Sequence, residues 1–203
     1  MAFAIEMCIV HNHLIRILNS IYLQAPHVTN PTDIQDFIAY MHAFTMLIHE
    51  HHGHEEELFF PWIEEELGIP GYMSPNVEQH HAFGPGLHEF EDYVKGLKEG
   101  KVVYDGAKVR AIIDGFGEVL ATHLTEEITF LEGMEEFGDK INWESVMKRV
   151  SKYAVDNANT VCALLSSFHF LLPPKHRLRI TRALANKNIH HAGVCLAHHA
   201  HQR

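Results

Sequence analysis

The chain has 203 residues, 46% of them apolar and 21% charged, values that are ordinary for a soluble protein of one domain with an extension. Its net charge of −10 argues against nucleic acid as a ligand, and its three cysteines are too few and too widely spaced for a disulfide framework or a cysteine metal site. Because no basic leader precedes the first apolar residues and the longest apolar run, residues 161–172, is shorter than the ~20 residues of a membrane span, we expect a cytoplasmic protein that binds no membrane.

The first part of the chain predicts two long helices. The first covers residues 2–24 and ends before Pro26. Asn30 and Pro31 are residue types that favour a helix cap and a first turn, so the second helix begins there and continues to about residue 67. Pro61 lies inside this second pattern and predicts a kink, because proline has no backbone N–H to donate.

Two further long helices follow. Ser74 and Pro75 open the third, which ends near Gly100, and Asp105 can cap the fourth, which ends before Gly138. No stretch shows the alternation of apolar and polar residues that is typical of strands. The sequence therefore predicts an all-α fold in which residues 1–140 form a four-helix bundle.

The remaining residues, 141–203, form a basic extension that contains histidines. This segment carries 9 lysines and arginines against 2 acids, whereas residues 1–140 carry 7 against 24. We expect Asn142 to begin a fifth helix and a further helix to end before Pro173. An apolar stripe of Trp143, Val146 and Val150 can pack on the acidic bundle, and the basic surface can alternatively meet an acidic protein partner.

Helical phase places one histidine and one glutamate on the same apolar face in two of these helices. Residues i and i+4 lie about one turn apart on one side of a helix. His51 and Glu55 fall inside the apolar stripe of the second helix, and His123 and Glu127 fall inside that of the fourth, which also includes Val119. By the same count His49 points away from the stripe, and His52 and Glu56 lie towards its edge.

The other two long helices each carry one inward histidine, His11 and His80. A single histidine on an apolar face is more often a hydrogen-bonded core residue than a ligand. An unpaired buried carboxylate, in contrast, costs several kcal/mol, and no lysine is expected in this core. A bound cation would compensate Glu55 and Glu127 directly, so these residues predict a metal site.

The donor types limit which metal is expected. Imidazole and carboxylate ligands from a helix bundle suit iron or manganese, and zinc is less favoured because it prefers four ligands. The zinc-protease motif fails, since Gly53 stands where HExxH needs its second histidine. The Glu-x-x-His pairs of ferritin-like bundles are also missing, because this spacing occurs in the bundle only from Glu78 to His81.

At these residues the chain resembles the hemerythrin-like, HHE cation-binding domains, and most closely their fungal members. The matching stretches are HN at residues 11–12, HHGHEE at 51–56 with FFP at 59–61, NVEQH at 76–80 and HLTEE at 123–127, within residues 1 to about 140. The resemblance implies an up-down bundle holding two irons bridged by Glu55, Glu127 and a solvent oxygen, with zinc or manganese as substitutes. Carried over residue by residue, the implied ligands are His11, His51, Glu55, His80, His123 and Glu127.

Two positions depart from the pattern of the oxygen-carrying hemerythrins. Those proteins place a second histidine four residues after the third-helix ligand, where this chain has Gly84. They also have an aspartate five residues after the fourth-helix histidine, where this chain has Glu127 at four. Unless His81 or Glu91 replaces the missing histidine, a coordination position stays open.

The resemblance therefore implies a di-iron protein that binds or senses O2 or iron, rather than a simple oxygen carrier. Two alternatives remain at this point. One is a di-iron enzyme that acts on peroxide or nitric oxide, and the other is a bundle in which the metal only stabilises the fold. The expected external ligand is O2, another small diatomic molecule or peroxide.

Overall fold

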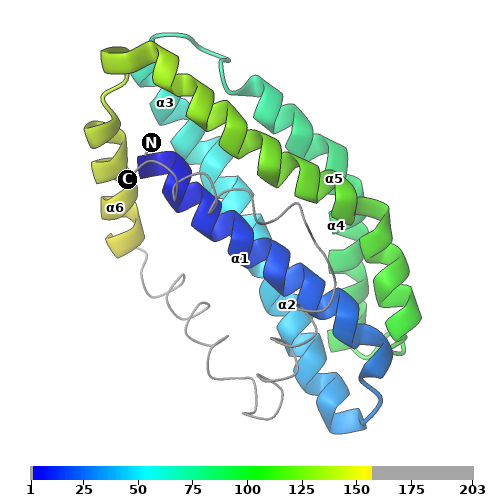
Figure 1. Ribbon diagram of the computed structural model, residues 1–203. Helices are drawn as coiled ribbons and strands as arrows, with labels where there is room; N and C mark the ends of the chain where they lie inside the picture. The colour runs from blue at the N-terminus through cyan, green and yellow to red at the C-terminus, as the bar shows by residue number, and fades with distance from the viewer. Residues whose placement is uncertain (1, 157–203) are drawn as a thin grey trace, which may run out of the picture. The chain divides into compact units, whose positions relative to one another are not determined.

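Figure 1 shows the computed structural model, in which residues 2–156 are described. The long helices are α1 (Ala2–Gln24), α2 (Pro31–His54), α4 (Ser74–Lys98) and α5 (Gly106–Gly133). Shorter elements are α3 (Phe60–Leu67), α6 (Trp143–Asp156), the 3-10 turns η1 (Ala25–His27) and η3 (Met134–Lys140), and a π-helical turn η2 (Glu55–Phe59). The described residues contain no strand, which confirms the all-α prediction. The helix expected before Pro173 and the histidines after it lie outside the described residues.

The four long helices form the expected bundle. Helix α1 packs beside α2 and α5, and α4 packs beside the same two helices, so the four close into a ring. Figure 1 shows that neighbours in this ring run in opposite directions. The up-down four-helix bundle is thereby confirmed. None of the helices in the described part of the chain is long and apolar enough to cross a membrane.

Two of the predicted helix starts are stabilised by side-chain caps. The Asn30 side-chain oxygen accepts the backbone N–H of Thr32 at 2.9 Å. The Asp105 carboxylate accepts the N–H of Ala107 at 2.8 Å and that of Lys108 at 3.2 Å. Each cap satisfies amide groups that have no partner within the first turn of a helix.

The expected kink at Pro61 takes the form of a π-helical turn. In an α-helix the N–H at position 61 would bond the carbonyl of Glu57, and proline cannot supply it. The chain widens instead, and the N–H of Phe60 bonds the carbonyl of Glu55, five residues earlier. The helical rod over residues 31–67 therefore consists of α2, η2 and α3, and the wide turn begins at a candidate ligand, a frequent location for such turns.

Aromatic side chains pack α4 closely against α2 and α5. The Phe90 ring lies 6.2 Å from that of Phe44 and 6.1 Å from that of Phe116, measured between centroids. A Cβ atom at Gly86 would lie only 2.6 Å from the Cβ of Phe116. Glycine at this position therefore allows α4 and α5, which carry His80 and His123, to approach each other.

Helix α6 packs on the end of the bundle through apolar contacts. The Trp143 ring stacks on Phe3 at 6.0 Å with an interplanar angle of 25°, and Val146 is fully buried. These two residues lie on the apolar stripe expected for this helix, while Val150 is half-buried. The division of the chain at residue 140 remains a prediction.

Polar contacts also fix α6. The Arg149 guanidinium lies 2.7 Å from a carboxylate oxygen of Glu65 and 4.8 Å from the centre of the Trp62 ring. Tyr153 Oη and His54 Nε2 lie 2.8 Å apart. Helix α6 therefore contacts both α2 and α3.

Candidate metal centre

The structure brings all six predicted ligands together inside the bundle. They come from α1, from α2 and the π turn that follows it, from α4 and from α5, and all are buried. The two carboxylates, Glu55 and Glu127, have no exposed surface at all. Their identity as ligands remains a prediction.

Donor atoms of these residues approach one another closely across the bundle. His51 Nε2 lies 3.0 Å from one oxygen of Glu55, and His80 Nε2 lies 3.5 Å from the other. On the other carboxylate, one oxygen of Glu127 lies 3.2 Å from His11 Nε2 and 3.9 Å from His123 Nε2. Glu55 therefore stands between two groups of imidazoles.

His52 is a candidate that helical phase did not select. It is only 7% exposed, its ring centroid lies 4.4 Å from that of His80, and its Nε2 makes no hydrogen bond. Donor atoms of His52, Glu55, His80 and His123 lie within 4.8 Å of one another, and those of His11, His51 and Glu55 do the same. The only sequence signal for His52 is its place beside His51 in the HHGHEE motif.

Neither residue considered as a replacement for the missing histidine at position 84 belongs to these groups. His81 is exposed on α4, and Glu91 pairs with His49 and His88 at the surface. Within the described residues, the histidine that joins these donor groups beyond the predicted ligands is His52 of α2, and no further histidine of α4 does so.

Three of the histidines are oriented by hydrogen bonds on the opposite side of the ring. The Nδ1 atoms lie 2.7 Å from the Leu124 carbonyl for His11, 2.7 Å from Glu56 Oε1 for His80, and 2.9 Å from Gln79 Oε1 for His123. These partners are oxygen acceptors, so each Nδ1 donates its hydrogen and Nε2 is the nitrogen that faces the centre. Such outer contacts are typical of metal-binding histidines.

Several buried donor atoms at the centre have no hydrogen-bond partner in the described part of the chain. They are Nε2 of His11, His51 and His52 and both oxygens of Glu55 and Glu127. No lysine or arginine of that part pairs with either carboxylate. Because buried carboxylates need compensation, and because the orphaned atoms converge, these residues fit a bound cation.

The spacing of the donors agrees with this interpretation. Two ligands at a right angle on an ion with bonds of about 2.1 Å lie about 3.0 Å apart. The 3.0 Å from His51 to Glu55 and the 3.1 Å between Nε2 of His80 and His123 match that value. Because Glu55 belongs to both groups of donors, it is placed to contact two ions.

When no cation is bound, the buried carboxylates favour the uptake of protons at the centre. Burial and the neighbouring Glu127 raise the pKa of Glu55 to about 8. Burial alone would lower the pKa of His11, but its interactions with Glu127 and Glu55 outweigh burial and raise that pKa to about 9. Burial and then the other histidines lower the pKa of His51 and His52 well below the ordinary value, and that of His123 to about 3. These three imidazoles are therefore neutral, the form in which a ring nitrogen can donate its lone pair to a metal.

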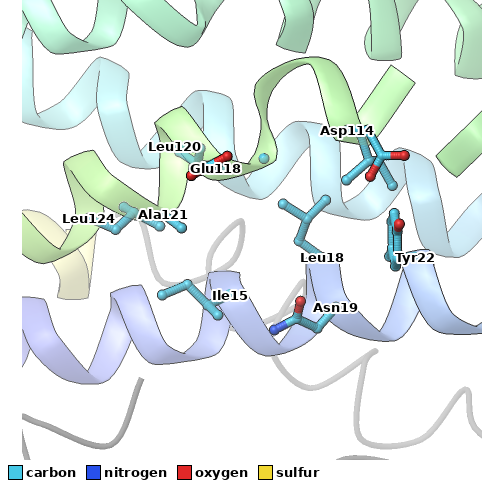
Figure 2. Close-up of a pocket in the computed structure, with 11 residues that line it drawn as sticks. Ile15, Leu18, Asn19, Tyr22, Asp114, Glu118, Leu120, Ala121 and Leu124 are labelled. Carbon is cyan, nitrogen blue, oxygen red and sulfur yellow. The ribbon is translucent and has the colours of Figure 1, made fainter. Parts of the chain in front are cut away.

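Two hollows flank the centre. A cleft of about 770 Å³ opens between α2 and α4, and His52 and His80 form part of its wall. A smaller hollow of about 250 Å³ lies between α1 and α5, where Figure 2 shows Ile15, Leu18 and Tyr22 of α1 facing Leu120 and neighbouring residues of α5. The walls of the two hollows differ in their histidines, which are present in the first and absent from the second.

Comparison with known proteins agrees with this site. The family model described as the hemerythrin HHE cation-binding domain matches residues 9–131, a range that includes every residue of the centre. A curated relative from Cryptosporiopsis sp. (strain 8999), named dimeric xanthone biosynthesis cluster protein R11, is 36% identical over 134 residues, which cover 66% of this chain and 50% of the relative. The chain thus spans about half the length of that relative. No solved structure matches the chain significantly. With more than half of its length matched, the chain belongs to the hemerythrin HHE cation-binding family.

Proposed function

We propose that the chain is a non-haem di-iron protein that binds O2 and thereby reports oxygen or iron availability. The observation that carries the proposal is the pair of overlapping donor groups, His52-Glu55-His80-His123 and His11-His51-Glu55, with Glu55 in both. Nitrogen and carboxylate donors in a helix bundle suit iron.

The number of donors supports binding of an outside ligand. The cluster offers five imidazoles and two carboxylates, counting His52 and Glu127. Five nitrogens and four carboxylate oxygens are fewer than the about twelve positions of two six-coordinate ions. A site that only stabilised the fold would be expected to be closed, so this count argues against the purely structural alternative.

When bound, iron would supply the affinity for O2 and the capacity for electron transfer. The protein's own residues orient the imidazoles and compensate the charge. The Phe60 ring stacks 5.9 Å from that of His80, and the Phe83 ring lies 5.4 Å from that of His123. These aromatic side chains lower the local polarity, which strengthens the electrostatic interactions of the centre.

Metal analysis combined with optical spectra of the purified chain tests the proposal. Protein produced with ample iron should carry close to two irons per chain, and the reduced form should develop a visible absorption band in air that is reversed when oxygen is removed. Zinc as the bound metal, or one ion per chain, would contradict the di-iron proposal. Irreversible oxidation would favour the enzyme alternative.

The second candidate is an oxidative di-iron enzyme. The observation in its favour is the name of the curated relative, which associates that protein with a cluster for the biosynthesis of dimeric xanthones. A centre with an open position suits turnover of peroxide or nitric oxide as well as binding of O2. Consumption of peroxide over many cycles by the loaded chain, at a rate proportional to its iron content, would favour this candidate.

A further inference from the structure

The cleft between α2 and α4 has an unusual lining for the surface of a bundle. Its wall includes six histidines, at positions 49, 52, 54, 80, 81 and 88. It also includes four glutamates, at positions 50, 56, 57 and 91, and no lysine or arginine. A concave surface of one sign of charge concentrates ions of the opposite sign, so this lining attracts cations.

At its inner end the cleft reaches the metal centre. His52 and His80 belong both to the cleft wall and to the donor cluster. Glu56 connects the two environments, because its carboxylate lies 2.7 Å from His80 Nδ1 while its side chain is 38% exposed. A cation in the cleft is therefore adjacent to a carboxylate that already contacts a candidate ligand.

At its outer end the cleft carries a second set of donors. The two oxygens of Glu91 lie 3.0 Å from His49 Nδ1 and 3.4 Å from His88 Nδ1. Both imidazoles are largely exposed, at 71% and 73%, whereas the Glu91 side chain is only 20% exposed. One carboxylate between two exposed imidazoles can hold a partly hydrated divalent cation weakly, as transfer to a stronger site requires.

We propose that this cleft is the route by which divalent metal reaches the buried centre, with Glu91, His49 and His88 as the site that captures the ion first. The inference rests on the proposed function in one respect, that the buried cluster holds metal. A cleft of about 770 Å³ has room for an ion with several waters, each of which takes ~30 Å³ in the liquid. The hollow between α1 and α5 has two carboxylates, Asp114 and Glu118, but no histidine and no residue of the donor cluster in its wall, so it is the poorer route for a cation (Figure 2).

The rate of metal uptake by the full chain tests the capture site. Metal-free protein is mixed with Fe²⁺ without oxygen, samples are quenched with a chelator, and bound iron is measured against time. Glu91→Gln should slow uptake by about tenfold or more at low salt and leave the final iron content unchanged. Glu89→Gln removes the same charge from an exposed position on the same helix, outside the cleft lining, and should load at the wild-type rate. Equal rates for Glu91→Gln and wild type, or equal slowing by both variants, would overturn the proposal.

A steric variant tests the route independently of charge. A Cβ at Gly53 in the cleft wall, or at exposed Gly115 on α5, meets no atom within 4 Å, so both backbone positions accept a side chain, and leucine is introduced at each. Gly53→Leu should slow uptake, whereas Gly115→Leu should not; wild-type kinetics in Gly53→Leu would overturn the route. If wild-type protein itself retained no iron at equilibrium, the metal centre would be refuted and the route with it. Slow uptake with a normal end point is the expected result.

Discussion

The Nε2 atoms of His80 and His123 lie 3.1 Å apart, and the Nδ1–H group of each ring donates to an oxygen acceptor. With Nδ1 of each ring bonded to Glu56 or Gln79, a neutral imidazole presents a lone pair at Nε2. Two lone pairs at this distance repel each other unless a proton or a cation lies near both. The helices α4 and α5 therefore hold these two rings in an arrangement that a metal ion would stabilise, and folding and metal loading should be coupled.

Removal of one inward histidine should reduce metal content and stability together. His51→Ala or His123→Ala takes one nitrogen from the cluster and leaves Glu55 or Glu127 less compensated. We expect iron content to fall by about half or more and the melting temperature of the iron-loaded protein to fall by several degrees. Metal analysis and thermal unfolding measure both quantities. His27→Ala, at an exposed position in η1, should change neither, and equal losses in that variant would contradict the assignment of the centre.

His52→Ala tests whether the imidazole found only in the structure is a ligand. Loss of contacts around a metal ligand costs about 10–100-fold in affinity, and loss of a ligand itself should cost at least as much. We therefore expect weaker iron binding in competition with a chelator, together with a changed spectrum of the oxidised protein on addition of azide. His81→Ala, an exposed neighbour of His80, is the matched control. Unchanged affinity and spectrum in His52→Ala would assign His52 to packing alone.

The metal-free protein should lose stability as the pH rises from about 6.5 to 8. The folded pKa of Glu55 is raised from 4.5 to about 8, so its contribution is complete below pH 4.5 and is lost as the pH approaches 8. His11, raised from 6.5 to about 9, acts in the same direction. Each proton contributes about 1–2 kcal/mol over this interval. Thermal unfolding at several pH values should show the decline in metal-free protein and a smaller one after iron loading, because the metal replaces the protons.

Below pH 6.5 the stability of the metal-free protein should depend on pH in the opposite direction. The folded pKa of His123 is lowered from 6.5 to about 3, so an unfolded chain takes up a proton that the folded chain refuses. The lowered pKa values of His51 and His52 act in the same direction, and the three histidines together outweigh the opposite effect of Glu55 between pH 4.5 and 6.5. Stability should therefore fall as the pH decreases from 6.5 towards 3. A metal-free protein whose stability rose steadily from pH 6.5 to 8 would contradict the protonation of Glu55 and His11.

Val146→Ala should weaken the attachment of α6 without affecting the metal. Val146 is fully buried, and truncation of a buried aliphatic side chain of this size lowers the free energy of unfolding by about 1–3 kcal/mol. Denaturant unfolding measures the loss, and metal analysis should show unchanged iron content. Val103→Ala, at a position that is 88% exposed, provides the control. Loss of iron in Val146→Ala would show that α6 supports the centre directly.

The sequence by itself determined which residues of each helix face inward. Helical periodicity is a property of the local backbone, so the 100° step places His51, Glu55, His123 and Glu127 on apolar faces whatever the neighbouring helices do. All four are buried in the structure. The helix caps at Asn30 and Asp105 are local in the same sense, since each bonds amides two or three residues away.

Only the tertiary structure decided how wide the buried face is and what lies across it. Val119 shares the phase of His123 yet is 43% exposed, while His52 lies towards the edge of its stripe by phase and is 7% exposed. The difference depends on where the adjacent helices lie, and periodicity contains no information about their positions. The contacts of His80 with Glu56, of His11 with the Leu124 carbonyl and of Tyr153 with His54 join segments 24 to 113 residues apart. Side-chain direction is set within a helix, but coordination requires several helices to converge on one point, and packing alone determines that convergence.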